Sequence, residues 1–190
     1  MKKGWTTTKL ITVGGLAVVR FLARFVIYIT ILVTTGSLFS GLIALIIAPF
    51  FVTFTALVIN QFGAVTIFSL LSFITDLPTP SIFPKVVNFI FVPSAGLTVD
   101  ILFFLLKKRK QWFGFWGGFI FNFVHVLLAV ILYFSIGLPG AENVPGFITK
   151  PSGVVFTTLL VSIMGGAFGM LGYLSYQKIK NTAVVKRIQA

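Results

Sequence analysis

Long apolar segments, separated by short polar or proline-containing breaks, make up most of this chain. A helix needs about 20 predominantly apolar residues to cross a hydrocarbon core of about 30 Å. Six segments reach or approach that length, the third being the shortest: residues 10–35, 38–59, 62–75, 86–106, 112–136 and 153–177. The pattern predicts an all-α, polytopic membrane protein, a six-transmembrane-helix bundle, with residues 1–190 forming a single integral membrane domain.

Basic residues decide between six crossings and an alternative of five. The run Lys107-Lys108-Arg109-Lys110 separates the fourth and fifth segments, and other lysines and arginines lie near both chain ends. Short loops rich in Lys and Arg stay on the cytoplasmic side. Six crossings place all three basic groups inside, whereas five crossings, with residues 1–24 as an interfacial helix, place the N-terminal group opposite the others. We therefore expect a multi-pass protein of the cell membrane with both termini cytoplasmic.

The composition supports a membrane location. Hydrophobic residues make up 57% of the chain and charged residues 9%, and the mean hydropathy is +1.07. A formal net charge of +12 is also typical of proteins that bind nucleic acid. Most of the basic residues lie just outside apolar segments, however, where they meet anionic lipid headgroups. We expect the lipid bilayer as a partner, and no nucleic acid.

The sequence offers little for catalysis. Its three acidic residues, Asp76, Asp100 and Glu142, lie in different segments, and it contains no cysteine. They lack the paired spacing that metal binding or general acid–base chemistry needs. The motifs of zinc proteases, serine hydrolases and phosphate-binding loops are also absent. We predict that the protein is not an enzyme and has no metal or cofactor.

Polar residues inside the apolar segments are few and therefore informative. A charge in the hydrocarbon region costs at least about 2.5–3.5 kcal/mol on insertion scales. Arg20 and Arg24 share one face of the first helix, Asp100 lies in the fourth and His125 near the middle of the fifth. Arg20 and Asp100 lie at comparable depth, which predicts a buried ion pair between them. We favour a structural role for this pair over a transport role.

Small residues indicate where helices approach closely. Gly114 and Gly118 form a GxxxG spacing in the fifth segment, and Gly165 and Gly169 form another in the sixth. Such spacing lets two backbones pack tightly in lipid. Packing within the chain is the favoured interpretation, with contact to a partner membrane subunit as the alternative.

Several features together resemble one membrane family. They are the segment Ala56-Leu57-Val58-Ile59-Asn60-Gln61-Phe62-Gly63-Ala64, then Pro80, Ala95-Gly96-Leu97 and Asp100, with a break at Ala48-Pro49 and two proline-rich outer loops. The chain is similar to the substrate-binding S component of an energy-coupling factor (ECF) transporter, and the local likeness is to the branch associated with thiamine precursors.

The resemblance implies a membrane subunit of an ECF-type ABC importer that captures a vitamin or related small-molecule ligand from outside. Its partners would be the ECF transmembrane partner and the ATPase subunits. The implied ligand-binding residues are Asn88, His125 and Tyr133 in helices and Asp76 and Glu142 in outer loops. The implied partner-contact residues are Gly14, Ala17, Ser40 and Ala44. The alternative is a non-transporting scaffold or accessory subunit of a larger membrane complex.

Overall fold

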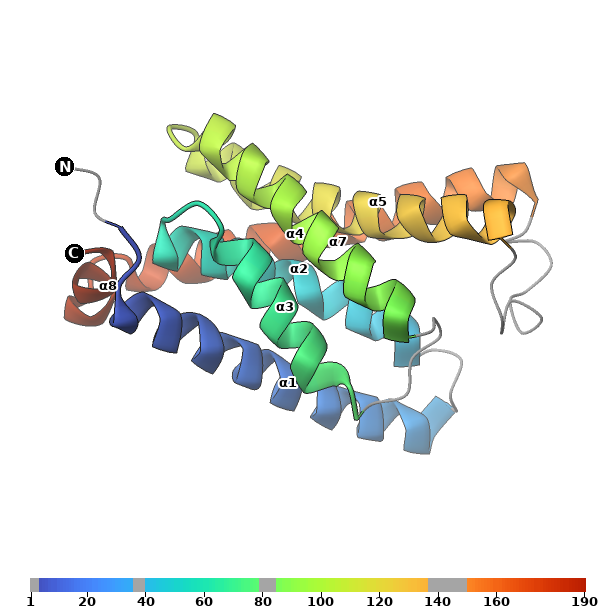
Figure 1. Cartoon of the computed structure of the whole chain (residues 1–190), viewed down its shortest axis with the longest axis horizontal. Helices are drawn as coiled ribbons and strands as arrows, with labels where there is room; N and C mark the ends of the chain where they lie inside the picture. The colour runs from blue at the N-terminus through green and yellow to red at the C-terminus, as the bar shows by residue number, and fades with distance from the viewer. Residues whose placement is uncertain (1–3, 36–39, 79–84, 137–149) are drawn as a thin grey trace.

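The computed structural model describes residues 4–35, 40–78, 85–136 and 150–190 (Figure 1). These residues form seven helices and no strand, which confirms the all-α class. The helices are α1 Thr7–Thr35, α2 Ser40–Ile59, α3 Ala64–Asp76, α4 Lys85–Leu106, α5 Lys110–Ile136, α7 Pro151–Ile179 and α8 Ala183–Gln189.

Each of the six predicted segments corresponds to one helix, and every predicted end lies within three residues of the observed one. The proposed break at Ala48-Pro49 is wrong, because α2 continues through Pro49. A helix tolerates proline in lipid when neighbouring helices satisfy the freed carbonyl. The short helix α8 has no counterpart among the predicted segments.

Four helical stretches in the described residues are long and apolar enough to cross a membrane: Thr7–Thr30, Asn88–Leu106, Lys110–Leu132 and Pro151–Ile179. They define a membrane-embedded protein. The apolar parts of the other two helices, Ile47–Ile59 and Ala64–Asp76, are shorter. With 13 residues, α3 is about 20 Å long, which is less than the thickness of the hydrocarbon core.

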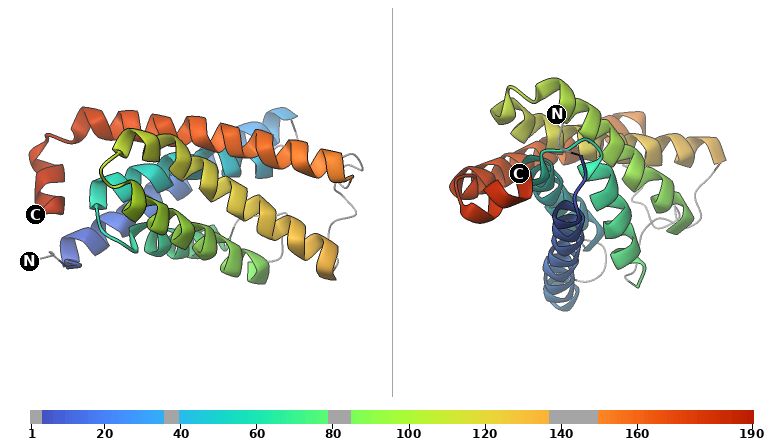
Figure 2. Two further views of the ribbon diagram at one scale, coloured as in Figure 1. Left: turned by 90° about the horizontal axis from the view of Figure 1, so that it is seen from above. Right: turned by 60° about the vertical axis from the view of Figure 1, so that its left-hand side comes forward.

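The chain runs up and down between two ends of the bundle. Helices α1, α3 and α5 begin at the end that carries both chain termini, and α2, α4 and α7 return to it (Figures 1 and 2). Because α3 is short and inclined, its last turn lies beside the middle of α1, well before α5 and α7 reach the opposite end (Figure 1). We call these the terminal end and the opposite end of the bundle.

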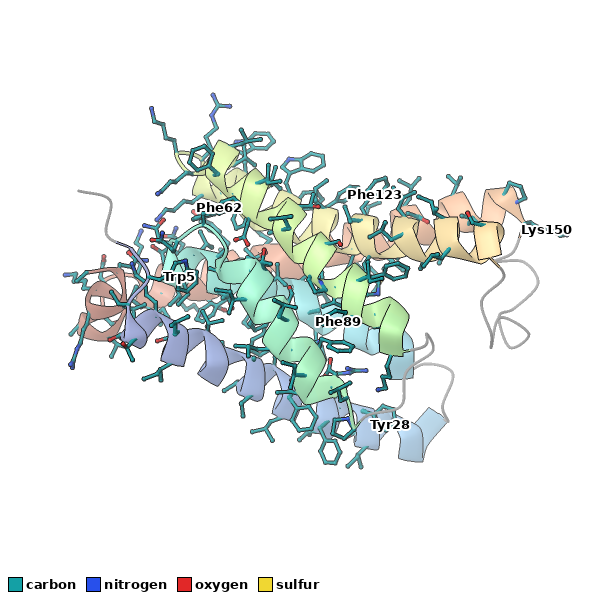
Figure 3. All side chains as sticks on the ribbon, in the orientation of Figure 1. Trp5, Tyr28, Phe62, Phe89, Phe123 and Lys150 are labelled. Carbon is teal, nitrogen blue, oxygen red and sulfur yellow. The ribbon has the colours of Figure 1, made fainter. Side chains whose placement is uncertain are left out.

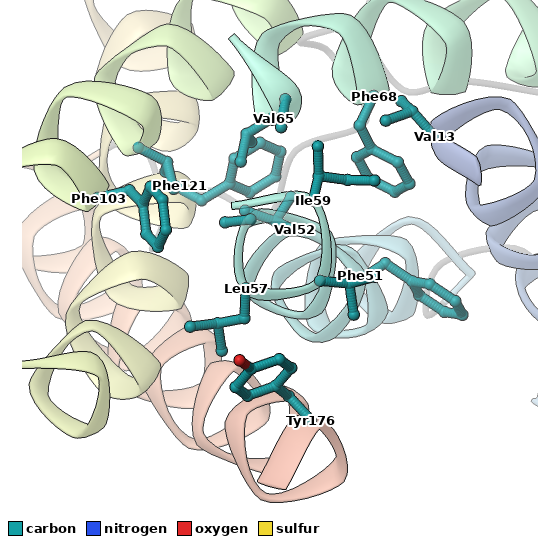
Figure 4. Close-up of a cluster of buried hydrophobic side chains, with 14 of the residues drawn as sticks. Val13, Phe51, Val52, Leu57, Ile59, Val65, Phe68, Phe103, Phe121 and Tyr176 are labelled. Carbon is teal, nitrogen blue, oxygen red and sulfur yellow. The ribbon is translucent and has the colours of Figure 1, made fainter. Parts of the chain in front are cut away.

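Helix α2 forms the centre of the core. It is apolar on all sides, as expected of a helix surrounded by others. Val52, Leu57 and Ile59 project from it in different directions and meet side chains of neighbouring helices, including Phe68 of α3 and Tyr176 of α7 (Figure 4). All of these side chains except Tyr176 are at least 99% buried.

Glycines allow the close contact of α5 with α7. A Cβ atom on Gly165 would lie 2.7 Å from the carbonyl oxygen of Gly118, and one on Gly169 would lie 2.5 Å from that of Gly114. Both GxxxG pairs therefore face each other within this chain, which confirms the prediction of intramolecular packing. This seam leaves no room for any larger residue without moving backbone.

The terminal end is closed by α8. Its apolar side chains Val185 and Ile188 are buried, and Thr182 caps its first turn by accepting from the backbone N–H of Val185. The side-chain amide of Gln189 donates to the carbonyl oxygens of Leu57 and Val58 at 2.9 and 3.1 Å. It thereby satisfies carbonyl groups in the last turn of α2 that lack intrahelical partners.

Candidate functional site

A cluster of charged groups lies where α1, α3 and α4 meet. Asp76 Oδ2 accepts from Arg20 Nη1 at 2.8 Å and lies 2.5 Å from Arg24 Nη1. Lys85 Nζ donates to the backbone carbonyl of Asp76 at 3.1 Å. We call Arg20, Arg24, Asp76 and Lys85 the charged cluster. The side chains of the two arginines and of Asp76 are 9–16% exposed.

Local structure explains why these four groups converge. Arg20 and Arg24 are one turn apart and so project from the same face of α1. Asp76 is the last residue of α3 and Lys85 the first of α4, so the connection between these helices brings both to α1. Lys85 lies before the apolar stretch Asn88–Leu106. Desolvation, followed by repulsion from Arg24, lowers the pKa of Lys85.

The predicted ion pair between Arg20 and Asp100 is wrong. Arg20 pairs with Asp76 instead. The fully buried Asp100 accepts from the backbone N–H groups of Val65 and Thr66, at 3.1 and 2.8 Å. It also accepts from the Thr66 hydroxyl at 2.7 Å. Gly63, with φ 86°, precedes α3 and offers no side-chain cap. Asp100 thus caps α3 from a neighbouring helix, where a carboxylate also complements the helix dipole.

Asp76 was predicted in an outer loop, but it ends α3. Counted from the first residues of α1, α3 and α5, Arg20, Asp76 and His125 lie about 20, 18 and 23 Å along their helices at 1.5 Å per residue. All three helices begin at the terminal end (Figure 1). The cluster and His125 therefore lie well inside the bundle, near the middle of α1 and α5.

His125 extends the polar region toward α5. It is 8% exposed, lies beside the rings of Phe91 and Phe121, and interacts electrostatically with Arg20. Its Nδ1 atom and the hydroxyl of Ser72 are buried and have no hydrogen-bond partner among the residues that the structure describes. Buried polar atoms are normally paired, so these two groups are available to a bound molecule.

The other predicted ligand-binding residues divide into two groups. Asn88 is half-buried one turn beyond Lys85 on α4, close to the cluster along the chain. Tyr133 belongs to α5, but its side chain lies outside the described part, and so does all of Glu142.

In Figure 3, Tyr28 on α1 and Phe89 on α4 mark the helices that flank the end of α3. Phe89 makes an edge contact with Phe73 of α3, with ring centroids 5.4 Å apart.

The predicted partner-contact residues differ in accessibility. A Cβ atom on Gly14 would meet nothing within 4 Å, so this part of α1 is open. Ala17 is 1% exposed and belongs to the core, so its prediction as a partner contact is wrong within the chain as folded. The side chains of Ser40 and Ala44 lie outside the described part of the structure.

Sequence reasoning missed the central feature of this site, the sharing of Asp76 by two arginines. A signal for it existed, since Arg20 and Arg24 have helical spacing and the chain has only three acidic residues.

Among the described residues, no group of three His, Cys, Asp or Glu side chains comes together to hold a metal ion. The groups present can instead bind through guanidinium, ammonium and imidazole donors.

Comparison of the chain with family models, with curated proteins and with solved structures finds no match. The class that the fold and the site define is a membrane-embedded helical bundle with a buried charged cluster.

Proposed function

We propose that this chain is the solute-capture membrane subunit of an ECF-type importer, taking up a vitamin or related small molecule from outside the cell. In this proposal all six helices α1–α5 and α7 lie in the bilayer, both termini are cytoplasmic, and the opposite end of the bundle faces outward. The basic residues near both termini and in the connection between α4 and α5 support this orientation through the positive-inside tendency.

The observation that carries the proposal is the position of the charged cluster. The ion-paired side chains of Arg20, Arg24 and Asp76 are only 9–16% exposed beside the middle of α1, with the half-buried Lys85 of α4 at their edge and the buried His125 nearby. Ionisable residues in a membrane interior are costly and usually mark a ligand or ion pathway. In this proposal a solute would reach the polar region from the outer side, past the end of α3, which lies beside the middle of α1 (Figure 1).

Ligand screening tests the proposal directly. The full chain, purified in a neutral detergent, is screened against water-soluble vitamins and their precursors for thermal stabilisation. A ligand at 100 times its Kd adds about 2.7 kcal/mol to the stability of the bound protein. We expect at least one compound to raise Tm in a saturable manner. If a folded, monodisperse preparation binds none of them, the proposal is refuted.

A pair of matched variants locates the binding site. Arg24→Met removes a cluster guanidinium, and Arg109→Met removes an exposed one at the terminal end. We expect Arg24→Met to abolish the ligand-induced shift and Arg109→Met to leave it intact. Equal loss in both variants would place the binding elsewhere and contradict the proposed site.

A scaffold function is the second candidate, and one observation favours it. A Cβ atom added to Gly14 or Gly15 of α1 would meet nothing within 4 Å, so a partner helix can approach there. Enlarging Gly14 to Leu separates the two functions, because it disrupts assembly with a partner complex in a scaffold but leaves solute binding by the isolated chain unchanged.

A further inference from the structure

Four consecutive basic residues lie where the chain turns from α4 into α5 at the terminal end. Helix α4 ends at Leu106 and α5 begins at Lys110, so the connection consists of residues 107–109. The turn is tight, because the backbone N–H of Arg109 donates to the carbonyl oxygen of Leu106 at 2.7 Å. Side chains that end in nitrogen project from this connection away from the bundle (Figure 3). Like charges this close together repel one another unless an anion lies between them.

A hollow opens to the surface beside this connection, between the start of α5 and α7. Its volume is about 480 Å³, and it is lined by Lys107, Lys108, Arg109, Lys110, Gln111, Trp112 and Tyr173. We call it the basic hollow. The ammonium group of Lys110 donates to the hydroxyl of Tyr176 at 3.2 Å and lies over its ring. Gly114 packs closely against Tyr173, since a Cβ atom on this glycine would lie 2.7 Å from the Cβ of Tyr173. These contacts between α5 and α7 hold the walls of the hollow in place.

None of the three acidic side chains in the sequence neutralises the basic hollow. Asp76 is paired within the charged cluster, and Asp100 is fully buried at the start of α3. Glu142 lies six residues beyond the last residue of α5. With 27 residues, α5 is about 39 Å long. Six extended residues span at most about 22 Å, so Glu142 stays too far from Lys110 for an ion pair.

The basic hollow lies directly between two candidate membrane spans. The apolar stretch of α4 ends at Leu106, and that of α5 begins at Lys110. Exposed apolar side chains adjoin the connection, since Phe104 and Leu105 of α4 are 63% and 72% exposed and Trp112 of α5 is 61% exposed. Tryptophan is enriched at the interface between membrane and water. The surface therefore suits a molecule in which an anionic group is joined to apolar chains.

We infer that the basic hollow binds one anionic phospholipid, with its phosphate at the ammonium groups of Lys107 and Lys108 and its acyl chains along the last turn of α4. Basic pockets between membrane helices suit phosphate-containing headgroups. The two lysines directly follow the exposed Phe104 and Leu105, so a lipid whose chains contact these side chains brings its phosphate to both lysines. The hollow is at the terminal end and the charged cluster lies beside the middle of α1, so the inference does not depend on the proposed solute.

Two lipids with the same acyl chains test the inference. Dioleoyl phosphatidylglycerol, which is anionic, and dioleoyl phosphatidylcholine, which is zwitterionic, are each titrated into the full chain in a neutral detergent. Native mass spectrometry counts the lipids retained by each protein molecule. We expect phosphatidylglycerol to fill a first site at a concentration at least about tenfold lower than phosphatidylcholine. Equal occupancy by the two lipids would overturn the inference.

Charge-matched variants assign the lipid to the basic hollow. The pair Lys107→Gln and Lys108→Gln removes two charges from the hollow, and the pair Lys180→Gln and Lys186→Gln removes two exposed charges near the C-terminus. We expect the first pair to weaken the first phosphatidylglycerol site at least about tenfold and the second pair to change it less than about twofold. Arginine at both hollow positions keeps the charge and should keep the affinity. Equal weakening by the two glutamine pairs, or loss of binding in the arginine variant, would refute the site.

A soluble phosphate compound carries the same anionic group as a lipid headgroup. Glycerol 3-phosphate and inorganic phosphate are therefore compared with phosphatidylglycerol in thermal unfolding of the full chain, at constant ionic strength. We expect a saturable increase in Tm with the lipid that requires Lys107 and Lys108, and none with either soluble compound, because they lack chains that contact α4. If a soluble phosphate stabilises the protein through these lysines as well as the lipid does, the hollow is a site for a soluble phosphate compound and the lipid inference is overturned.

Discussion

Replacing Asp100 by Asn tests how α3 is held in place. The substitution keeps the size of the side chain but exchanges one carboxylate oxygen for an NH2 group, which cannot accept from a backbone N–H. Oδ2 accepts from both the N–H and the hydroxyl of Thr66, and Oδ1 accepts from the N–H of Val65. At least one of these buried donors therefore loses its acceptor, and the remaining bonds lose their charge.

The expected loss follows from these contacts. A hydrogen bond to a charged group contributes about 1.5–3 kcal/mol, and a buried donor left unpaired costs about 1–3 kcal/mol. We expect Asp100→Asn to lower the free energy of unfolding by about 3 kcal/mol. At about 2–4 °C per kcal/mol for a chain of this size, Tm should fall by roughly 6–12 °C, measured by thermal unfolding in detergent.

Two variants provide the comparison. Thr66→Val removes only the hydroxyl bond and should cost about 1 kcal/mol. In Arg20→Met, hydrogen exchange of the first turn of α3 should match that of the wild type, since Arg20 does not contact Asp100. If Asp100→Asn changes stability by less than about 0.5 kcal/mol, which is the usual range for an uninvolved site, Asp100 does not act as the cap.

Three further predictions concern the packing, the cluster and α8. Gly118→Ala should destabilise the bundle by about 1–3 kcal/mol, because the added methyl group overpacks against Gly165. Gly14→Ala, in open space, should be neutral or stabilise the protein by up to about 1 kcal/mol through helix propensity. Equal Tm values for the two variants would contradict this prediction. Asp76→Asn should cost about 3–5 kcal/mol in chemical unfolding, because two buried arginines lose their counter-ion, and an unchanged midpoint would exclude a role for the pair. Gln189→Ala should cost about 1 kcal/mol and speed hydrogen exchange in the last turn of α2, while unchanged exchange would mean that α8 does not hold that turn.

Much of the secondary structure followed from local sequence. Apolar runs of membrane length, ended by proline, glycine or basic residues, predicted six helices to within three residues at each end. Helix α8 escaped because it has only seven residues, too few for an apolar pattern to stand out. Its burial depends on docking against α1 and α2, which local sequence does not encode.

The site shows where local reasoning stops. Depth along a helix adds up at about 1.5 Å per residue, so the sequence by itself placed Arg20 and Asp100 at comparable levels and suggested that they pair. Which way each side chain points around the bundle depends on the tilt and packing of neighbouring helices. Tertiary structure alone decided that the short α3 inclines toward α1, which brings Asp76 to the arginines and leaves Asp100 to cap the start of α3.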